Sequence, residues 1–248
     1  MVADACYIGC NKMYDEIFGW IKTGPAQPTL YIATEQDLSE IQTMMLAFIS
    51  DVNEEHIIDG KYEGDEEDRV MEAAQILKNA PLYVEHLPDF SLQDVENKIK
   101  RNIRDHDIRY CFMDYIHTSM KILEEITRRS GGIRLREDNV LFMLSDKLKN
   151  ICNQYGIFIL SATQLNADYQ TSETPDQNLL RGAKSIADRI DFGAIMLLVR
   201  DDDKKGLEKI LSTGTFDTPQ IKISVYKNRR GRYKGIYLWC KDRKSIRL

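Results

Sequence analysis

Short apolar stretches alternate with amphipathic segments along most of the chain. Five stretches combine β-branched, aromatic and aliphatic residues in the way that is typical of buried strands. They are residues 29–34, 82–86, 108–114, 157–162 and 193–199. The segments around them carry apolar residues three or four positions apart, which predicts helices at 3–20, 36–49, 66–79, 92–103 and 141–151. Continuous apolar strands separated by helices predict an α/β domain with a mostly parallel sheet flanked by helices.

Local signals mark the ends of two of these helices. Ser91 and Asp94 have the spacing of a capping box, in which each side chain accepts a hydrogen bond from the other residue's backbone N–H. Gly156 is well placed to end the helix around 141–151. The polar stretch near 128–132 and the charged segment 200–219 are expected to be loops.

The last part of the chain has a different pattern. Residues 221–227 and 235–241 each alternate between apolar and polar positions, and a basic loop separates them. Two such runs around a short loop containing glycine predict a C-terminal antiparallel hairpin. We expect residues 1–248 to form a single domain, because this length suits one large core.

The formal net charge of −5 conceals a strong asymmetry. Residues 220–248 contain ten Lys or Arg and one acid, whereas residues 51–68 contain nine acids and one Lys. The acidic run is expected to be a solvated surface. The basic tail needs a phosphate or an acidic partner, because like charges that are packed together repel each other.

Composition excludes several classes of protein. No apolar run approaches the roughly 18 residues that a membrane-spanning helix needs, and the N-terminus lacks the pattern of a secretory signal. Cys6 and Cys10 share one face of the expected first helix, but no second pair completes a zinc site. We expect the five cysteines to be reduced thiols of a cytoplasmic protein.

Polar residues follow three of the expected strands. Glu35, Asp114 and Gln164 come at or just after the ends of 29–34, 108–113 and 157–162. Ligands of parallel sheets bind at the carboxyl ends of the strands, and Mg²⁺ often needs only one or two carboxylates besides phosphate oxygens. The three residues therefore form a candidate site for a nucleoside triphosphate and Mg²⁺. Each has a simpler reading: Asp114 as a turn cap, Glu35 as an acid at a helix start, and Gln164 as a loop residue.

Five segments in order along the chain carry a resemblance to a known family. They are YIATEQ (31–36), CFMDYIH (111–117), ILSATQLNAD (159–168), LRGAKSIADRID (180–191) and KNRRG (227–231). Together they resemble the ATPase domain of DnaB-type replicative helicases, which has a RecA-like fold and works as a hexameric ring.

This resemblance implies a role for each residue of the candidate site. Glu35 corresponds to the catalytic glutamate, Asp114 to the acid that holds Mg²⁺, and Gln164 to the amide that senses the phosphate. ATP and Mg²⁺ are the implied cofactors, and single-stranded DNA is the implied substrate of translocation. A homo-hexamer is implied as the assembly, with primase and a helicase loader as candidate partners.

The resemblance also assigns the basic loop. In the family, the hairpin reaches the nucleotide site of the neighbouring subunit, so Arg229 corresponds to the arginine finger and Lys227 to its companion. Gly231 and Gly235 would allow the hairpin to turn tightly. Two other readings remain for this loop: a patch that contacts nucleic acid, and a solvated edge hairpin protected by its charges.

DNA contact is expected in a different segment. Arg181, Gly182 and Lys184 belong to a short basic turn that resembles the DNA-contacting loop of the family, although the family usually has Arg-acid-small-Gly there. Such a turn can follow a phosphate backbone with its N–H groups and one or two cations. Alternatively, Arg181 caps the next helix or pairs with Asp188.

One family motif is absent from the sequence. No Gly-x-x-x-x-Gly-Lys-Ser/Thr, the loop that cradles nucleotide phosphates, occurs in the 248 residues. In the family this loop directly precedes the first helix, so we expect the chain to be cut just after it, with the first core strand missing. We expect little or no ATP hydrolysis by the chain alone, either as a fragment of a helicase or as an ATPase-deficient paralogue.

Three functional hypotheses follow. The preferred hypothesis is the motor domain of a replicative DNA helicase that hydrolyses ATP between subunits. The second is a RecA-like relative with another task, such as a recombinase or a clock-type ATPase. The third is a regulator without hydrolytic activity, which keeps the finger and binds to the ring of a partner.

Overall fold

The computed structural model describes residues 1–129, 136–170, 176–180, 184–231, 236–241 and 244–247. The chain divides into two units. Unit 1 comprises residues 1–163 and 244–246, and unit 2 comprises residues 164–243 and 247–248. Each unit contains a sheet of its own.

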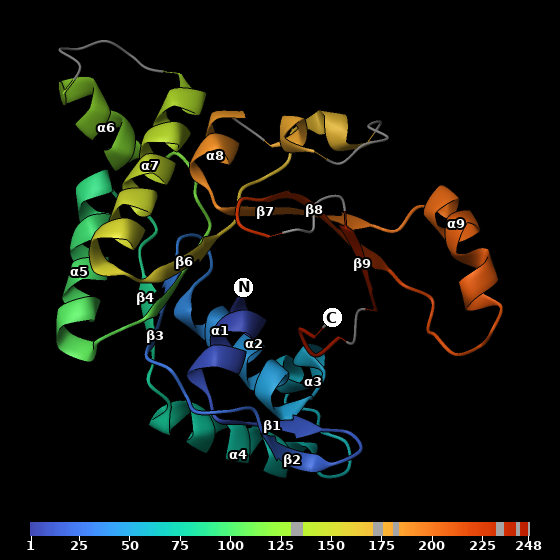
Figure 1. Ribbon diagram of the computed structural model, residues 1–248. Coiled ribbons are helices and arrows are strands. Elements are labelled where there is room, and N and C mark those ends of the chain that lie inside the picture. The colour runs from blue at the N-terminus through green and yellow to red at the C-terminus, as the bar shows by residue number, and fades with distance from the viewer. Residues whose placement is uncertain (130–135, 171–175, 181–183, 232–235, 242–243, 248) are drawn as a thin grey trace. The chain divides into compact units, whose positions relative to one another are not determined.

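A four-stranded parallel sheet forms the centre of unit 1 (Figure 1). Its order is β4 (Leu82–His86), β3 (Thr29–Ala33), β5 (Tyr110–Asp114) and β6 (Phe158–Ser161). These are four of the expected strands, and the expected parallel pairing is confirmed. Every residue of β3 is buried, as a continuous apolar run in a central parallel strand requires.

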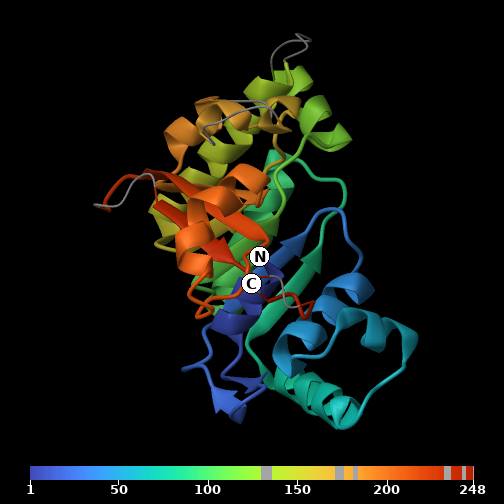
Figure 2. The same ribbon diagram turned by 90° about the vertical axis from the view of Figure 1, so that its right-hand side faces the viewer.

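The N-terminal region differs from the expected long helix. Helix α1 ends at Gly9 (Val2–Gly9), and an antiparallel hairpin of β1 (Lys12–Asp15) and β2 (Gly19–Lys22) follows, at the lower end of unit 1 in Figure 2. The prediction of a helix over 3–20 was therefore wrong. Asp15 Oδ1 accepts hydrogen bonds from the N–H groups of Ile17 and Phe18 and so favours a turn. Gly19 then takes a positive φ of 68°, and this turn chemistry outweighed the helical spacing.

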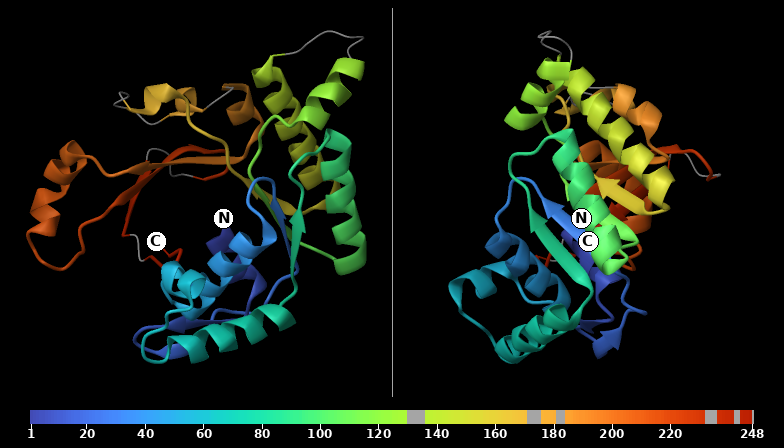
Figure 3. Two further views of the ribbon diagram at one scale, coloured as in Figure 1. Left: turned by 180° about the vertical axis from the view of Figure 1, so that it is seen from behind. Right: turned by 90° about the vertical axis from the view of Figure 1, so that its left-hand side faces the viewer.

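Helices cover both faces of the main sheet. Figure 3 shows α5 (Leu92–His106) and α7 (Glu137–Tyr155) on one face, and α1 and α2 (Leu38–Ser50) on the other. α4 (Glu66–Asn79) packs against α2, and the short α3 (Glu54–Asp59) precedes it. The core against α1 and α2 includes the buried side chains of Tyr31, Phe112, Ile41 and Met45.

Helix α6 (Met120–Arg129) occupies part of a stretch that was expected to be a loop. Ser119 Oγ accepts a hydrogen bond from the N–H of Ile122 and caps the first turn. Ile122 and Ile126 are buried four residues apart. The polar residues at 128–129 therefore end a helix whose start the sequence analysis did not identify.

Unit 2 contains an antiparallel sheet in the order β7 (Phe192–Leu198), β8 (Ile221–Asn228) and β9 (Ile236–Cys240). The expected C-terminal hairpin, β8 with β9, is confirmed. The segment around 193–199 was expected to be a fully apolar strand of the parallel sheet, and this is wrong. β7 pairs antiparallel with β8 and alternates between buried and exposed positions over most of its length, as a half-covered antiparallel strand does.

Helix α9 (Asp201–Leu211) connects β7 to β8, where a charged loop was expected. Its charges favour the helix, because Asp201, Asp202 and Asp203 lie in the first turn, at the positive end of the helix dipole. Lys204 and Lys205 pair with Asp201 and Asp202 at i,i+3 spacing. The loop prediction failed because it treated a helix with few apolar residues as unstructured.

The predicted helix ends are confirmed. At the start of α5, Ser91 Oγ accepts from the N–H of Asp94 at 3.0 Å, and Asp94 Oδ2 accepts from the N–H of Ser91 at 3.0 Å. Glu125 adds a third contact at this helix start, because its Oε2 accepts from the N–H of Leu92 at 2.7 Å. Gly156 ends α7 with a φ of 64°.

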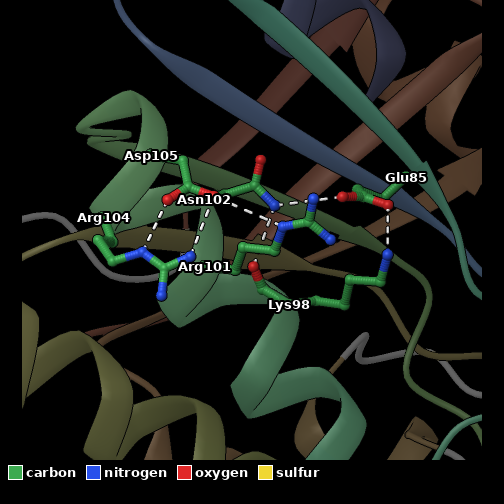
Figure 4. A network of polar contacts seen from close by, with 6 residues as sticks. All are labelled: Glu85, Lys98, Arg101, Asn102, Arg104 and Asp105. Atoms are coloured by element: carbon green, nitrogen blue, oxygen red, sulfur yellow. Dashed lines mark hydrogen bonds and ion pairs between the residues drawn. The ribbon is translucent and has the colours of Figure 1, made fainter.

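A polar network connects β4 to α5 (Figure 4). Lys98 Nζ lies 2.6 Å from Glu85 Oε2, and Asn102 Nδ2 donates to Glu85 Oε1 at 3.4 Å. Burial by itself raises the pKa of the Glu85 carboxyl, but the hydrogen bonds from Lys98 and Asn102 outweigh burial and hold the pKa below its ordinary value. The network orients α5 on the outer strand of the sheet.

No helix within the described ranges is both long enough and apolar enough to cross a membrane. The five cysteines all lie within the described ranges and form no disulfide there. Burial raises the pKa of the Cys10 thiol to about 12.

The capping box of α5 makes a first testable prediction. Ser91→Ala removes the acceptor for the N–H of Asp94, and we expect the free energy of unfolding to fall by about 1 kcal/mol. Urea denaturation followed by circular dichroism measures this change. Ser39→Ala on α2 is the matched control, because the Ser39 hydroxyl only donates to the exposed Asp37 carboxylate. Equal effects of the two substitutions would contradict the capping role.

Candidate functional site

The carboxyl ends of β3 and β5 are joined by Thr34. The strands pair in register from Thr29 with Tyr110 to Ala33 with Asp114. Beyond the last pair, the N–H of Thr34 donates to Asp114 O at 2.9 Å, and the N–H of Tyr115 donates to Thr34 Oγ1 at 2.9 Å. The Thr34 hydroxyl lies 2.7 Å from Asp114 O and 3.1 Å from Tyr115 O, within donating distance of both. Thr34 is buried, so these bonds fix the backbone from which both acids extend.

The Asp114 carboxylate accepts a hydrogen bond from a buried tyrosine. Tyr31 lies on β3, two residues before the partner of Asp114, and its hydroxyl donates to Asp114 Oδ2. Burial raises the pKa of Tyr31 well above its ordinary value, and the hydrogen bond to Asp114 raises it further. Tyr31 therefore remains a proton donor. It orients Asp114 so that the second carboxylate oxygen is the one that can bind a cation.

Glu35 is held from the side by the residue after Asp114. The Tyr115 hydroxyl donates to Glu35 Oε1 at 2.6 Å. Glu35 is exposed at the end of β3, and the Asp114–Tyr115 peptide bond is cis. The sheet thus brings Glu35 and Asp114 together at one edge, as the positions of these acids in the sequence indicated.

Aromatic rings support Tyr115. The ring centroids of Tyr115 and His117 are 5.4 Å apart, and His117 packs edge-on against the fully buried Phe90 at 5.1 Å. His117 Nε2 is buried and has no hydrogen-bond partner among the described residues. Sequence reasoning missed these contacts. The available signal was the Asp-Tyr pair at a strand end, which placed Tyr115 beside the site without indicating its hydrogen bond.

The third expected residue, Gln164, follows β6. The N–H of Ile116 donates to Ala162 O at 3.0 Å, so the chain leaving β6 passes the same edge of the sheet. Gln164 is exposed and is the first residue of unit 2. The structure thus places it after the predicted strand, while its role as a phosphate sensor remains a prediction.

The basic residues of the hairpin make contacts inside unit 2. Arg229 Nη1 lies 3.1 Å from Asp191 Oδ1, and Nη2 donates to Asp188 O at 3.2 Å. Lys227 Nζ donates to Ala187 O, at the same short helix, α8 (Lys184–Arg189). Both side chains therefore contact the same segment, residues 187–191. The side chain of Arg229 is about half exposed, at 49%, so it can still be reached by another molecule.

Gly231 lies where the hairpin leaves β8. Its N–H donates to Asn228 Oδ1 at 2.8 Å. A Cβ at this position would lie 1.9 Å from Asn228 Nδ2, so glycine permits the close approach. Gly235, Arg181 and Gly182 lie outside the described residues, and Lys184 is the first residue of α8.

The donor set fits Mg²⁺ better than a metal that needs a complete protein cage. Among the described residues, no group of three or more His, Cys, Asp or Glu side chains could hold a metal ion. Asp114 supplies one oriented carboxylate. Mg²⁺ is commonly held by one or two carboxylates together with phosphate oxygens and water.

Comparisons with known proteins agree with this architecture. The family model for the DnaB-like helicase C terminal domain matches residues 4–245. The chain is 37% identical over 241 residues to the SPbeta prophage-derived uncharacterized protein YorI of Bacillus subtilis (strain 168), covering 95% of the chain and 48% of that protein. It is 24% identical over 166 residues to the replicative DNA helicase DnaB of Mycoplasma genitalium, covering 66% of the chain and 33% of that protein. The chain thus spans half or less of the length of these relatives.

Solved structures show the same fold. A solved ATPase domain matches with a TM-score of 0.67 and 14% identity. The match covers 90% of this chain and 75% of that chain. A DnaB-like replicative helicase, from a structure that describes its interactions with primase, matches with a TM-score of 0.66 and 13% identity. That match covers 86% of this chain and 49% of that chain. The expected RecA-like α/β fold is confirmed.

The bond between Tyr31 and Asp114 predicts a pH dependence. Because the pKa of Tyr31 is raised in the folded protein, its stabilising contribution is complete below the ordinary pKa of about 10 and is lost as the pH rises above it. The unfolding free energy of the wild type should fall above pH 10 by about 1.4 kcal/mol per pH unit more steeply than that of Tyr31→Phe. Urea titrations from pH 9 to 11 measure both slopes, and parallel slopes would contradict the assignment.

Proposed function

Because the chain belongs to the family of DnaB-like helicase C-terminal domains, we propose that it is the motor part of an ATP-driven replicative DNA helicase. The observation that carries the proposal is the joined edge of β3 and β5. There Glu35 and Asp114 lie at neighbouring strand ends, and Thr34 and Tyr115 connect them. Phosphoryl transfer to water uses one group that orients the attacking water and a metal ion that neutralises the phosphate charge, and two such acids suit these roles.

The two acids have different tasks in this proposal. Glu35 is exposed and can orient a water molecule and accept its proton as the water attacks the γ-phosphate. Asp114 would hold Mg²⁺, which supplies charge neutralisation on the phosphate oxygens. Tyr31 donates to Asp114 and keeps its carboxylate in one orientation. Gln164, after β6, would sense whether the γ-phosphate is present.

We propose that Arg229 completes the site of a neighbouring copy in a homo-hexameric ring. A guanidinium that enters a nucleotide site in this way stabilises the charge on the transferring phosphoryl group. The present ion pair of Arg229 with Asp191 is half exposed, and exposed pairs contribute little to stability. Arg229 can therefore exchange Asp191 for a phosphate at small cost, with Lys227 beside it as a second cation.

Single-stranded DNA is the proposed track of the motor. Arg181, Gly182 and Lys184 are the proposed contacts, through backbone N–H groups and two cations. One solved relative is described by its interactions with primase. Primase and a helicase loader are accordingly proposed partners of this chain.

ATP hydrolysis requires a loop that cradles the nucleotide phosphates. No Gly-x-x-x-x-Gly-Lys-Ser/Thr occurs in these 248 residues. ATP hydrolysis is therefore expected of a protein that joins such a loop to this chain. Such a protein carries a strand and this loop in front of the 248 residues. We call it the loop-extended protein.

The loop-extended protein should hydrolyse ATP in the presence of Mg²⁺ and unwind a forked DNA duplex. Asp114→Asn should lower kcat by about 100-fold or more, because the metal ion loses its anionic ligand. Phosphate release measures the rate. Asp105→Asn is the matched control, since Asp105 pairs with Arg104 on the exposed side of α5. Retention of more than half of the activity by Asp114→Asn would contradict the assignment.

The absence of the loop motif favours one second candidate function. The chain without the loop keeps Arg229, and it would act as a regulator that enters the ring of an active helicase. Titration of the chain into the loop-extended protein should then change ATP hydrolysis in proportion to the amount added. An unchanged rate at a tenfold excess of the chain would exclude a regulator.

A further inference from the structure

We propose that Tyr115 is a positioning residue for Glu35: its hydroxyl fixes the carboxylate in the orientation needed to receive a proton from the attacking water. The inference rests on the proposed function, in which Glu35 is the catalytic base. The inference adds Tyr115, which follows β5 at the edge of the sheet, to the residues that contribute to the reaction. Three features support it: the anchoring of Tyr115, the freedom of Glu35 without it, and the use of the two carboxylate oxygens.

Tyr115 is anchored through its backbone. Its N–H donates to the buried Thr34 hydroxyl at 2.9 Å, and the N–H of the next residue, Ile116, donates to Ala162 O at 3.0 Å. Ile116 is itself buried. The residues that directly follow β3 and β6, Thr34 and Ala162, therefore hold the backbone of Tyr115 and Ile116.

The Tyr115 ring is supported as well. It lies against His117, with 5.4 Å between centroids and an interplanar angle of 52°. His117 in turn packs at 77° against Phe90, which is fully buried. A ring with such a support keeps few alternative rotamers, so the direction of its hydroxyl is defined by the fold.

Glu35 lacks comparable support. It is exposed, and the bond from Tyr115 is the one hydrogen bond of its carboxylate in the part of the chain that the structure describes. An exposed glutamate otherwise samples many rotamers. The 2.6 Å bond from the supported Tyr115 ring therefore restricts the rotamers of the Glu35 side chain.

The geometry leaves a suitable acceptor for the reaction. Tyr115 donates its single hydroxyl proton to Oε1, which leaves both lone pairs of Oε2 available to accept the proton of a water molecule. A base held in one orientation loses no rotational freedom when the reaction begins. Removal of the hydroxyl should therefore slow the chemical step and leave nucleotide affinity largely unchanged.

The decisive test uses the chain as it is, without nucleotide. Glutamate labelled with ¹³C allows side-chain relaxation of Glu35 to be measured by NMR in the wild type, in Tyr115→Phe and in Tyr110→Phe. Tyr110→Phe is the matched control, because the Tyr110 hydroxyl on β5 makes no hydrogen bond within the described residues. We expect a Glu35 side chain that is ordered in the wild type and in Tyr110→Phe, and mobile in Tyr115→Phe. Equal order in all three proteins would overturn the inference.

Kinetics of the loop-extended protein, which contains the whole chain, separate this inference from its premise. Tyr115→Phe should lower kcat about tenfold and leave the KM for ATP within about twofold, whereas Tyr110→Phe should change neither. Equal kcat values for both variants would refute a positioning role in the reaction. If the loop-extended wild type hydrolyses no ATP, the proposed function fails, while the NMR measurement still decides whether Tyr115 orders Glu35.

Discussion

Parallel pairing of β3 with β5 is the constraint on which the site depends. The register that pairs Ala33 with Asp114 is continued by Thr34, whose buried hydroxyl binds the backbone beyond the last pair. A slip of one residue would turn every side chain of β3 to the opposite face, so that Tyr31 would no longer point into the core or reach Asp114. Burial of the apolar side chains of both strands therefore specifies the register, and the register determines where Glu35 and Asp114 lie.

The two units carry complementary parts of the proposed chemistry. Unit 1 holds the two acids, each with one carboxylate oxygen bound to a tyrosine hydroxyl: Asp114 to Tyr31 and Glu35 to Tyr115. Unit 2 holds a guanidinium, Arg229, in an exposed ion pair that a phosphate can replace. Two oriented acids and a half-exposed guanidinium are compatible with the proposed site shared between two copies of the chain.

Much of the fold could be predicted from the sequence, and the failures have physical causes. Apolar runs and capping signals predicted the parallel strands and α5. Buried strands require apolar residues, and a helix cap requires particular side chains at a fixed spacing. Turn chemistry at Asp15 overrode the helical spacing of 3–20, and charge pairs stabilised α9 with few apolar residues. The placement of Glu35 and Asp114 at one edge of the sheet could be predicted from strand ends. The direction of the Tyr115 hydroxyl could not, since it depends on packing against His117, which Phe90 supports from a distant part of the sequence.

The claim that one copy's acids work with the next copy's arginine can be tested by complementation. Two inactive forms of the loop-extended protein, Glu35→Gln and Arg229→Ala, are mixed in equal amounts and assembled, and ATP hydrolysis is measured. Each variant supplies what the other lacks only where the two meet, so about a quarter of the interfaces of a random ring would contain both residues. The account predicts that hydrolysis reappears in the mixture at about that fraction of the wild-type rate. A mixture as inactive as either variant alone would contradict it.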